Sequence, residues 1–479
     1  MLRSRYGLLV LALAVMVNAC TVGVFSGRVT ADHRPMIWKN RDVDNADQAV
    51  HYFTDGRYPY LANVYACESE YAWSGVNQAG FAIMNANSFN IGSGAPEGIG
   101  DGEVMKLALQ TCATIDDFRR LLDSLNLVGR GTPCNLGVMD ASGATAMFEA
   151  GANSYTAWYS ESLPEGYIVR ANFSLCADTA GEKSNNRYLR ASQLVARGKA
   201  ANELDSRWLI ENVARDLGQT DFDPYPLPYE DTVGTLPCGF LPASTTISRY
   251  KTRSTVVIAG PRPGEPVSLS VMWTMLGEPV VAAPVPLWVA AQSVPEPLVD
   301  QPTARLCEEA QRMSVYLYSD SRYGSAINSF RLVEVNEALG PTFDTVWEST
   351  GEKLDRWAEQ PPAPGECAAF QNEMAGSTLF AYQRFWSVQP KADIPKPETT
   401  SFHASVVPGS PRIEIVVPAG TGSRRLRFCD VNGRSIADFA LAAAACHFDW
   451  QPDRLSNGLY FVTLESGKTR ETRSFCLLR

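Results

Sequence analysis

Cys20 is the residue of this sequence with the clearest potential for chemistry, because a predicted cleavage site lies directly in front of it. Two arginines near the start of the chain precede an apolar run over residues 7–17. This run has the length of the hydrophobic region of a signal peptide and is too short to span a membrane. Val17 and Ala19 supply small residues at the positions that guide signal cleavage, and a cut after Ala19 would make Cys20 the first residue of the mature chain.

A cysteine at the first position has three interpretations. It is a nucleophile if its own α-amine, with an ordinary pKa of about 7.7–8, takes the proton of the thiol. It is the acylated residue of a lipoprotein if residues 17–20 form a lipobox, and the lipid-bearing sulfur then cannot attack a substrate. It is a structural cysteine if it forms a disulfide beside the cleavage site.

Histidine is scarce, and this restricts the catalytic machinery that the chain could build. The only histidines stand at positions 33, 51, 403 and 447, so a histidine-based metal site or a Ser-His-Asp triad is difficult to assemble. The cysteines form no CxxC pair, which argues against zinc ribbons and thioredoxin-like redox motifs. We therefore expect a base other than histidine, no metal and no cofactor.

The composition is that of a globular, exported protein. Hydrophobic residues make up 45% of the 479 positions and charged residues 20%, which suffices for a sizeable core. The 42 basic residues against 52 acidic ones give a net charge of -10, and this argues against a nucleic-acid partner. Eleven cysteines suit an oxidising compartment, and the ten that remain after Cys20 is set aside could all pair. We expect the periplasm, the cell surface or the extracellular space.

The elements around Cys20 predict a layered domain. Cys20 begins a strand that forms a hairpin with residues 36–38 around a polar turn. Further strands are predicted at 80–84, 136–139, 145–148, 154–159, 167–170, 254–259, 267–275 and 280–289, and helices at 102–125 and 184–217. Strands, then helices, then strands indicate an α+β domain over residues 20–295.

Three further regions accompany this domain. Residues 1–19 are the predicted signal peptide. Residues 296–387 predict a helical extension, with helices at 304–319, 326–339 and 343–359, and a Pro-rich linker follows at 388–401. Residues 402–479 alternate as the strands of a small β-sandwich.

The first strand and its partner carry a family resemblance. The run from Cys20-Thr21-Val22-Gly23 to Lys39-Asn40-Arg41-Asp42 resembles the start of cysteine N-terminal nucleophile hydrolases of the choloylglycine hydrolase, penicillin acylase and acyl-CoA:6-aminopenicillanate acyltransferase group (peptidase C45-like). The resemblance implies a four-layer αββα fold. Lys39 stands where choloylglycine hydrolases carry arginine, so the charge is kept but the bidentate fork is lost. This departure argues against a bile-salt substrate.

Three later segments resemble the same group in the same order, so that the resemblance spans about residues 20–295. The strand at 80–83 leads to Asn87, with Asn85 as the alternative, where the family places an oxyanion-hole asparagine. Asn172 follows Arg170-Ala171 in the second asparagine segment. Arg253 opens the segment that resembles the family's arginine strand, with Arg249 as the alternative.

The resemblance implies a role for each residue. Cys20 attacks an amide carbonyl, Asp42 holds the α-amine, and Lys39 lowers the pKa of the thiol by its charge. Asn87 and Asn172 donate to the oxyanion, which is worth roughly 3–4 kcal/mol per donor in other acyl-transfer enzymes. Arg253 supports the site or the substrate. The structural alternatives are turn asparagines, a Lys39–Asp42 surface ion pair and a structural arginine.

The expected function is therefore an exported amidohydrolase. It would cleave a linear, non-peptide C–N amide of a small molecule through an acyl-enzyme on Cys20, followed by hydrolysis or by transfer to another amine. The alternative from a different class is a lipid-anchored binding lipoprotein, in which Cys20 carries the lipid.

The tail has a resemblance of its own. Its Asn432-Gly433-Arg434 turn, the strand at 458–461 and the basic hairpin end at 468–473 resemble the C-terminal sorting modules of type IX secretion. This implies a secretion machinery as partner. A carbohydrate-binding or merely structural sandwich is the alternative.

Overall fold

A computed structural model of the chain describes residues 19–181, 185–300, 303–318 and 325–389, and most of residues 402–477. The rest of the predicted signal peptide at 1–18, most of the predicted linker at 390–401, and the tail positions Asn432 and Lys468 lie outside the described residues.

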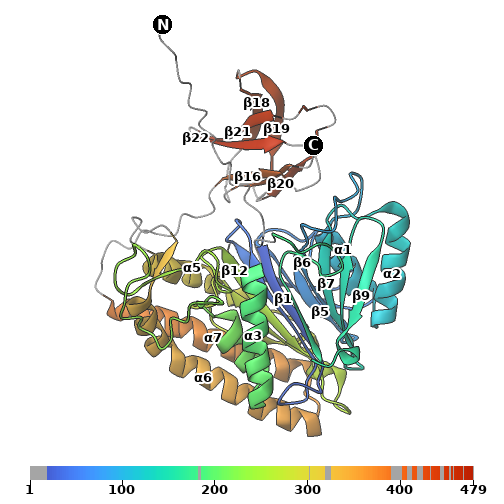
Figure 1. The fold of residues 1–479 in the computed structure, drawn as a ribbon, viewed down its shortest axis with the longest axis vertical. Coiled ribbons are helices and arrows are strands. Elements are labelled where there is room, and N and C mark those ends of the chain that lie inside the picture. The colour runs from blue at the N-terminus through green and yellow to red at the C-terminus, as the bar shows by residue number, and fades with distance from the viewer. Residues whose placement is uncertain are drawn as a thin grey trace.

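Two antiparallel sheets face each other at the centre of the layered region at residues 19–389 (Figure 1). In spatial order, the six-stranded sheet consists of β10 (Tyr167–Arg170), β1 (Ala19–Phe25), β2 (Met36–Asp42), β12 (Thr252–Ala259), β13 (Val271–Leu276) and β14 (Val285–Leu287). The seven-stranded sheet runs in chain order through β3 (Gln48–Phe53), β4 (Tyr60–Tyr65), β5 (Ser74–Asn77), β6 (Ala82–Asn87), β7 (Cys134–Met139), β8 (Thr145–Ala150) and β9 (Tyr155–Tyr159).

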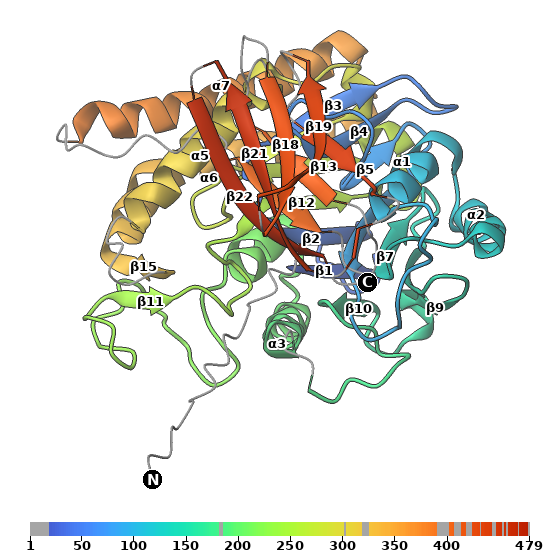
Figure 2. The ribbon, with the colours of Figure 1, turned by 90° about the horizontal axis from the view of Figure 1, so that it is seen from above.

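Helices cover the outer face of each sheet and complete four layers, as Figures 1 and 2 show. The seven-stranded sheet is covered by α1 (Asp101–Thr111) and α2 (Ile115–Val128). The six-stranded sheet is covered by α3 (Asn185–Ala201), the π-helix η2 (Leu209–Ala214), α6 (Ser329–Glu359) and α7 (Pro364–Val388), with α5 (Arg305–Leu317) beside α7. The predicted α+β fold with an αββα core is confirmed.

The helices after residue 295 belong to this layered core. On the outer face of the six-stranded sheet, the Trp273 and Trp347 rings lie 3.8 Å apart and the Trp288 and Trp357 rings 5.3 Å apart, measured between centroids. The region predicted as an extension therefore supplies one face of the core. We predicted two helices at 326–339 and 343–359, but α6 runs through Pro341 as one helix. Its buried side chains lie on both sides of the proline, so packing on the sheet holds the helix together.

Several sequence predictions differ from the structure. β3, β4 and β5 were not predicted. The strand expected at 280–289 is limited to β14, and that expected at 267–275 begins with a 3-10 turn before β13. The helix expected at 184–217 ends at Ala201 and resumes as α4 (Ser206–Trp208) and η2.

The C-terminal region is a separate two-sheet sandwich with its own apolar core. One sheet orders β16 (His403–Val406), β17 (Ile413–Val416) and β20 (His447–Trp450). The other orders β19 (Ser435–Leu441), β18 (Arg424–Asp430), β21 (Gly458–Ser466) and β22 (Thr469–Leu477). The Tyr71 hydroxyl donates to Asp449 Oδ2 at 3.0 Å, and this hydrogen bond connects the sandwich to the layered region at residues 19–389.

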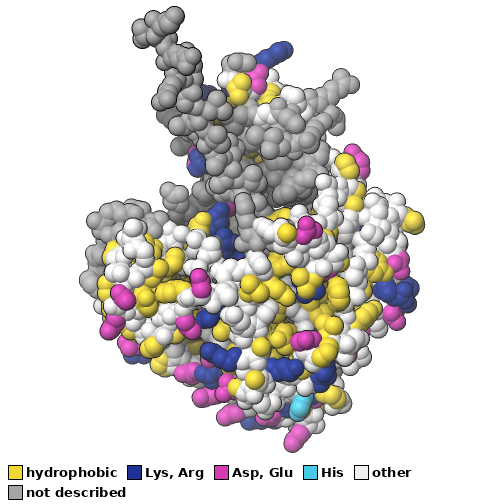
Figure 3. Space-filling model, in the orientation of Figure 1, with side chains coloured by type: hydrophobic (Ala, Val, Ile, Leu, Met, Phe, Trp, Pro, Cys, Tyr) yellow, Lys and Arg dark blue, Asp and Glu magenta, His cyan; other side chains and the backbone are white. Residues whose placement is uncertain are grey.

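The described part of the face in Figure 3 carries basic and acidic side chains interspersed, with no extended basic patch among them. Within the described ranges, no helix has the length and apolar character needed to cross a membrane.

Candidate active site

Strand alternation separates the polar residues of β1 and β2 into two groups. Cys20 pairs with Arg41 across the two strands, and Lys39 lies two residues before Arg41 on the same face. This inner face points toward the seven-stranded sheet. Asn40 and Asp42 point to the helical side. Every residue of β2 is buried, although four of its seven residues are polar or charged. Because burying such groups is costly without partners, each one must be held by a specific contact.

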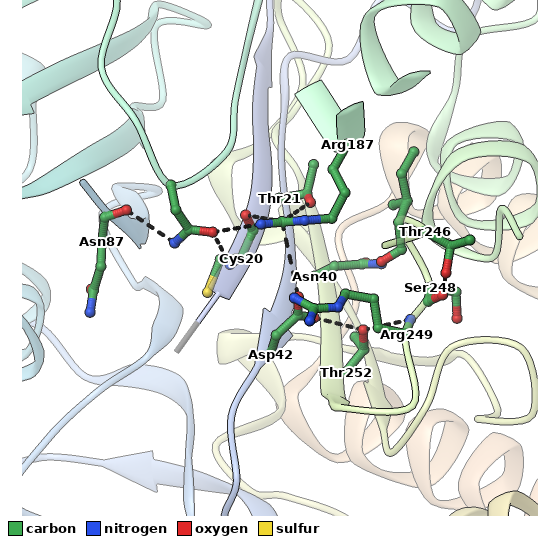
Figure 4. Close-up of polar contacts among 12 residues, drawn as sticks. Cys20, Thr21, Asn40, Asp42, Asn87, Arg187, Thr246, Ser248, Arg249 and Thr252 are labelled. Carbon is green, nitrogen blue, oxygen red and sulfur yellow. Dashed lines mark hydrogen bonds and ion pairs between the residues drawn. The ribbon is translucent and has the colours of Figure 1, made fainter. Parts of the chain in front are cut away.

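The backbone nitrogen of Cys20 is held by Asn172, at the end of β10 (Figure 4). It donates to Asn172 Oδ1 at 2.8 Å. The Asn172 amide nitrogen donates to the carbonyl oxygen of Asn87 at 3.0 Å. Asn172 is therefore placed to orient the nitrogen of Cys20, and the second N–H of its amide remains for the oxyanion role that we expected.

Arg187, near the start of α3, forms hydrogen bonds with both Cys20 and Asn172. It donates to the Cys20 carbonyl at 2.6 Å, to Thr21 Oγ1 at 2.7 Å and to Asn172 Oδ1 at 2.8 Å. Burial lowers the pKa of Arg187, and the negative charge of Asp42 opposes this effect. The guanidinium therefore fixes both Cys20 and the asparagine that receives its N–H.

Asp42 lies in a second group of contacts on the outer face. It accepts from the Thr252 hydroxyl at 2.6 Å and from Arg249 Nη1 at 3.0 Å, and Arg187 Nη1 lies 4.0 Å away. In the described structure, Asp42 makes no hydrogen bond to the Cys20 nitrogen. It acts on that residue through Arg187. The alternative of a Lys39–Asp42 surface ion pair is excluded, because both side chains are buried and lie on opposite faces of β2.

Arg249, which we considered as the alternative, is thus the arginine at Asp42. Arg253 occupies the irregular position between Thr252 and Ser254, where β12 bulges against β2. Its charge lies near the buried Glu278, whose pKa is raised to about 7 mainly by burial. Arg253 belongs to a different buried cluster.

Lys39 lies on the inner face beside Cys20. Its ammonium donates to the Trp73 carbonyl at 2.8 Å and to Asn85 Oδ1, and Asn85 in turn donates to Asp101 Oδ2 at 2.6 Å. Burial lowers the pKa of Lys39 to about 8, and the negative charges of Cys20 and Asp101 act in the opposite direction. An ammonium has three donors, so one remains for the thiolate or the substrate.

These contacts also separate the two candidate asparagines of β6. The Asn85 oxygen accepts from Lys39, and one N–H of the Asn85 amide donates to Asp101. The Asn87 side chain is half-buried and makes no hydrogen bond to a described residue. Asn87 therefore keeps both N–H groups of its amide, which favours it over Asn85 for the oxyanion role that we predicted.

The sequence analysis did not assign roles to Arg187, Thr252, Asp101 or Arg41. Strand alternation alone places Arg41 on the same face as Cys20, so the position of Arg41 beside Cys20 could have been predicted from the sequence. The other three lie far from Cys20 in the sequence and reach the site only through tertiary packing.

Neither described histidine side chain contacts Cys20. His51 is bound to Asp300 at 2.6 Å, and His33 lies in the turn at the opposite end of the β1–β2 hairpin. Among the described residues, no cluster of His, Cys, Asp and Glu could hold a metal ion.

The expected disulfides are not seen in the described structure, where Cys176, Cys238 and Cys429 are free in addition to four buried cysteines. Cys112, Cys134, Cys307 and Cys367 are buried free thiols. Burial raises the pKa of Cys112 and Cys367 to about 11 and that of Cys307 to about 12. These thiols lie within apolar core clusters, which explains their burial without pairing.

We expect Asp101→Asn to lower the pKa of Lys39 further below about 8, because the Asp101 carboxylate is one of the charges that raise it. Lys39 would then lose its proton at lower pH. The alkaline limb of the kcat/KM profile should move to lower pH. Glu103→Gln, in the same helical turn, is the control and should leave the limb in place. An unmoved limb in Asp101→Asn contradicts the role of this contact chain.

Comparison with known proteins gives one family match. The family described as "Acyl-coenzyme A:6-aminopenicillanic acid acyl-transferase" matches residues 29–255. No curated protein matches the sequence. Solved structures similar to this one include penicillin V acylase from Agrobacterium tumefaciens, with 15% identity over 56% of this chain and 85% of that chain and a TM-score of 0.35. A variant of conjugated bile acid hydrolase from Clostridium perfringens has 11% identity over 54% of this chain and 89% of that chain, with a TM-score of 0.34.

The family match covers β2, the whole seven-stranded sheet and β12 as far as Thr255. It begins after β1, so it includes residues that surround Cys20 but not Cys20 itself. The resemblance predicted from the β1–β2 hairpin is confirmed. Residues 29–255, a little under half of the chain, match this family, and the match supports an N-terminal nucleophile hydrolase of the acyl-coenzyme A:6-aminopenicillanic acid acyl-transferase group.

Proposed function

We propose that the protein is an exported enzyme that cleaves a linear, non-peptide amide with Cys20 as an N-terminal nucleophile. Amide hydrolysis or acyl transfer is the activity of its group. The observation that carries the finer proposal is the contact of the Cys20 nitrogen with Asn172 at 2.8 Å, in a site where no described histidine is in contact with the cysteine.

The proposed reaction begins once the bond between Ala19 and Cys20 has been broken. The free α-amine, oriented by Asn172, takes the proton of the thiol, and the sulfur attacks the amide carbon. Asn87 donates to the oxyanion, and the Lys39 ammonium stabilises the negative charge. When the C–N bond breaks, the leaving amine takes the proton from the α-ammonium. Water or a second amine then attacks the thioester and releases the acyl group.

The lipoprotein alternative fits this geometry less well. Cys20 is 7% exposed and its side chain faces the interior between the sheets. A lipid on its sulfur would have to leave this interior to reach a membrane. The export route, with the C-terminal sandwich as its sorting module, is part of the proposal.

The deciding experiment combines two measurements on the protein purified from its host. N-terminal sequencing should give Cys20 as the first residue. Acid quenching during turnover of an amide substrate, followed by peptide mass analysis, should show the acyl mass on the peptide that begins with Cys20. Labelled palmitate on Cys20, or an intact chain that is fully active with a different first residue, would overturn the proposal.

A further inference from the structure

The inner face of the site holds two buried cations, Lys39 and Arg41, beside Cys20. Each is 2% exposed. Within the described part of the chain, neither has a carboxylate within 4.0 Å. Buried charges are normally paired, because an uncompensated charge in the protein interior is strongly unfavourable. The site is therefore built with an excess of positive charge.

The two cations differ in the negative charge available to them. Lys39 reaches Asp101 through Asn85 and has the Cys20 thiolate nearby. No described side chain connects Arg41 to a carboxylate in this way. Its Nη1 donates to Gln48 Oε1, a neutral group, at 2.7 Å. The thiolate balances one cation, and Arg41 is left over.

Aromatic rings hold Arg41 in a fixed plane. Its guanidinium carbon lies 4.2 Å from the centroid of the Tyr65 ring and 4.4 Å from that of Trp73. Cation–π contacts of this kind orient a guanidinium without neutralising it. Its Nε and Nη2 have no acceptor among the described residues. The indole N–H of Trp73 is likewise buried without an acceptor. Unused donors thus gather at one place beside the nucleophile.

We propose that Arg41 is a substrate-binding residue, and that the substrate carries a carboxylate a few bonds from the amide that is cleaved. Residues directly opposite on antiparallel strands have Cβ atoms about 4.5–5.5 Å apart. Both side chains leave the inner face from neighbouring points, so an anion bound at the end of the Arg41 side chain lies within about the length of that side chain from a carbonyl carbon at Cys20. A planar guanidinium binds a carboxylate through two parallel hydrogen bonds. The inference rests on the proposed function and names the substrate class for it, an N-acyl amino acid or a comparable acidic amide.

The test uses full-length mature protein and matched pairs of amides. One pair is an N-acylglycine and its glycinamide, with the charge on the amine side. The other is a succinic acid monoamide and its methyl ester, with the charge on the acyl side. For at least one pair, kcat/KM should favour the acid at least tenfold, mainly through KM. The pair that shows the preference tells which side of the amide faces Arg41.

The variant Arg41→Met should bring this ratio of acid to neutral substrate close to one, and Arg41→Lys should restore part of it. Arg57→Met is the matched control, since Arg57 is an exposed arginine stacked on Tyr58 at 5.1 Å, away from the site. Its ratio should stay that of the wild type.

Two results overturn the inference. The first is a wild-type enzyme that acylates Cys20 but prefers the neutral member of both pairs, a result that does not depend on any variant folding. The second is an acid preference that survives in Arg41→Met. Both leave the proposed function standing. Absence of acylation at Cys20 with every substrate would instead overturn the proposed function, and this inference with it.

Discussion

A form of the protein that begins at Ala19 is expected to turn over substrate about 10²–10⁴ times more slowly than the form that begins at Cys20, with little change in melting temperature. An amide nitrogen has no basic lone pair, so the thiol would lose its general base, whose contribution is of that size. The fold should persist, because Ala19 is already a paired, buried residue of β1 opposite Asp42. The measurement is kcat/KM for two preparations that differ by this one residue.

Histidine variants provide the control for this result. His33→Ala and His51→Ala should keep most of the activity, since neither side chain contacts Cys20. Equal rates for the two N-terminal forms, or a large loss in a well-folded histidine variant, would show that the α-amine is not the base.

The second large effect is expected for Asp42→Asn. The buried carboxylate faces Arg249 at 3.0 Å and Arg187 at 4.0 Å, and removal of its charge would leave both cations uncompensated. Breaking a buried pair in this way costs about 3–5 kcal/mol. Activity should fall as well, because Arg187 positions Cys20 and Asn172. A thermal melt and a kcat measurement on the same preparation separate the two effects.

Asp44→Asn is the matched control for the charge change. Asp44 pairs with Lys251 only two residues beyond Asp42, but both side chains are about one-fifth exposed. Partly exposed pairs contribute about 0–1 kcal/mol. A similar loss of stability in both variants would argue that the burial of Asp42 has no special effect.

The part of the site that lies within one hairpin could be predicted from sequence. The alternation of β1 and the position of Cys20 at its start point to Cys20 as the proposed nucleophile, and Lys39 and Asp42 follow from the partner strand. In the C-terminal sandwich, β17, β18, β21 and β22 were likewise predicted, because their alternation is regular and turn residues separate them, whereas β16, β19 and β20 were not.

The choice between Arg249 and Arg253 shows what local sequence cannot give. The bulge between Thr252 and Ser254 turns Thr252 toward Asp42 and removes Arg253 from the regular alternation. A bulge adds one residue to one strand only, so its position depends on the register with β2. No pattern within residues 249–255 specifies that register.

Strand β4 could not be predicted from local sequence either. All six of its residues are buried, so it lacks the alternation that marks a half-exposed strand.

The pairing of Ala19 within β1 restricts when the Ala19–Cys20 bond can be cut relative to folding. Ala19 and Cys20 are each 7% exposed, and β2 runs along their full length. A processing protease needs its target bond as an accessible, extended segment, and the folded protein does not offer the Ala19–Cys20 bond in that form. Under the proposed maturation, this bond must be cut while the chain is still unfolded, or the folded chain must cut it by itself. If the bond is cut only by another protease, delayed processing would leave a folded, inert precursor.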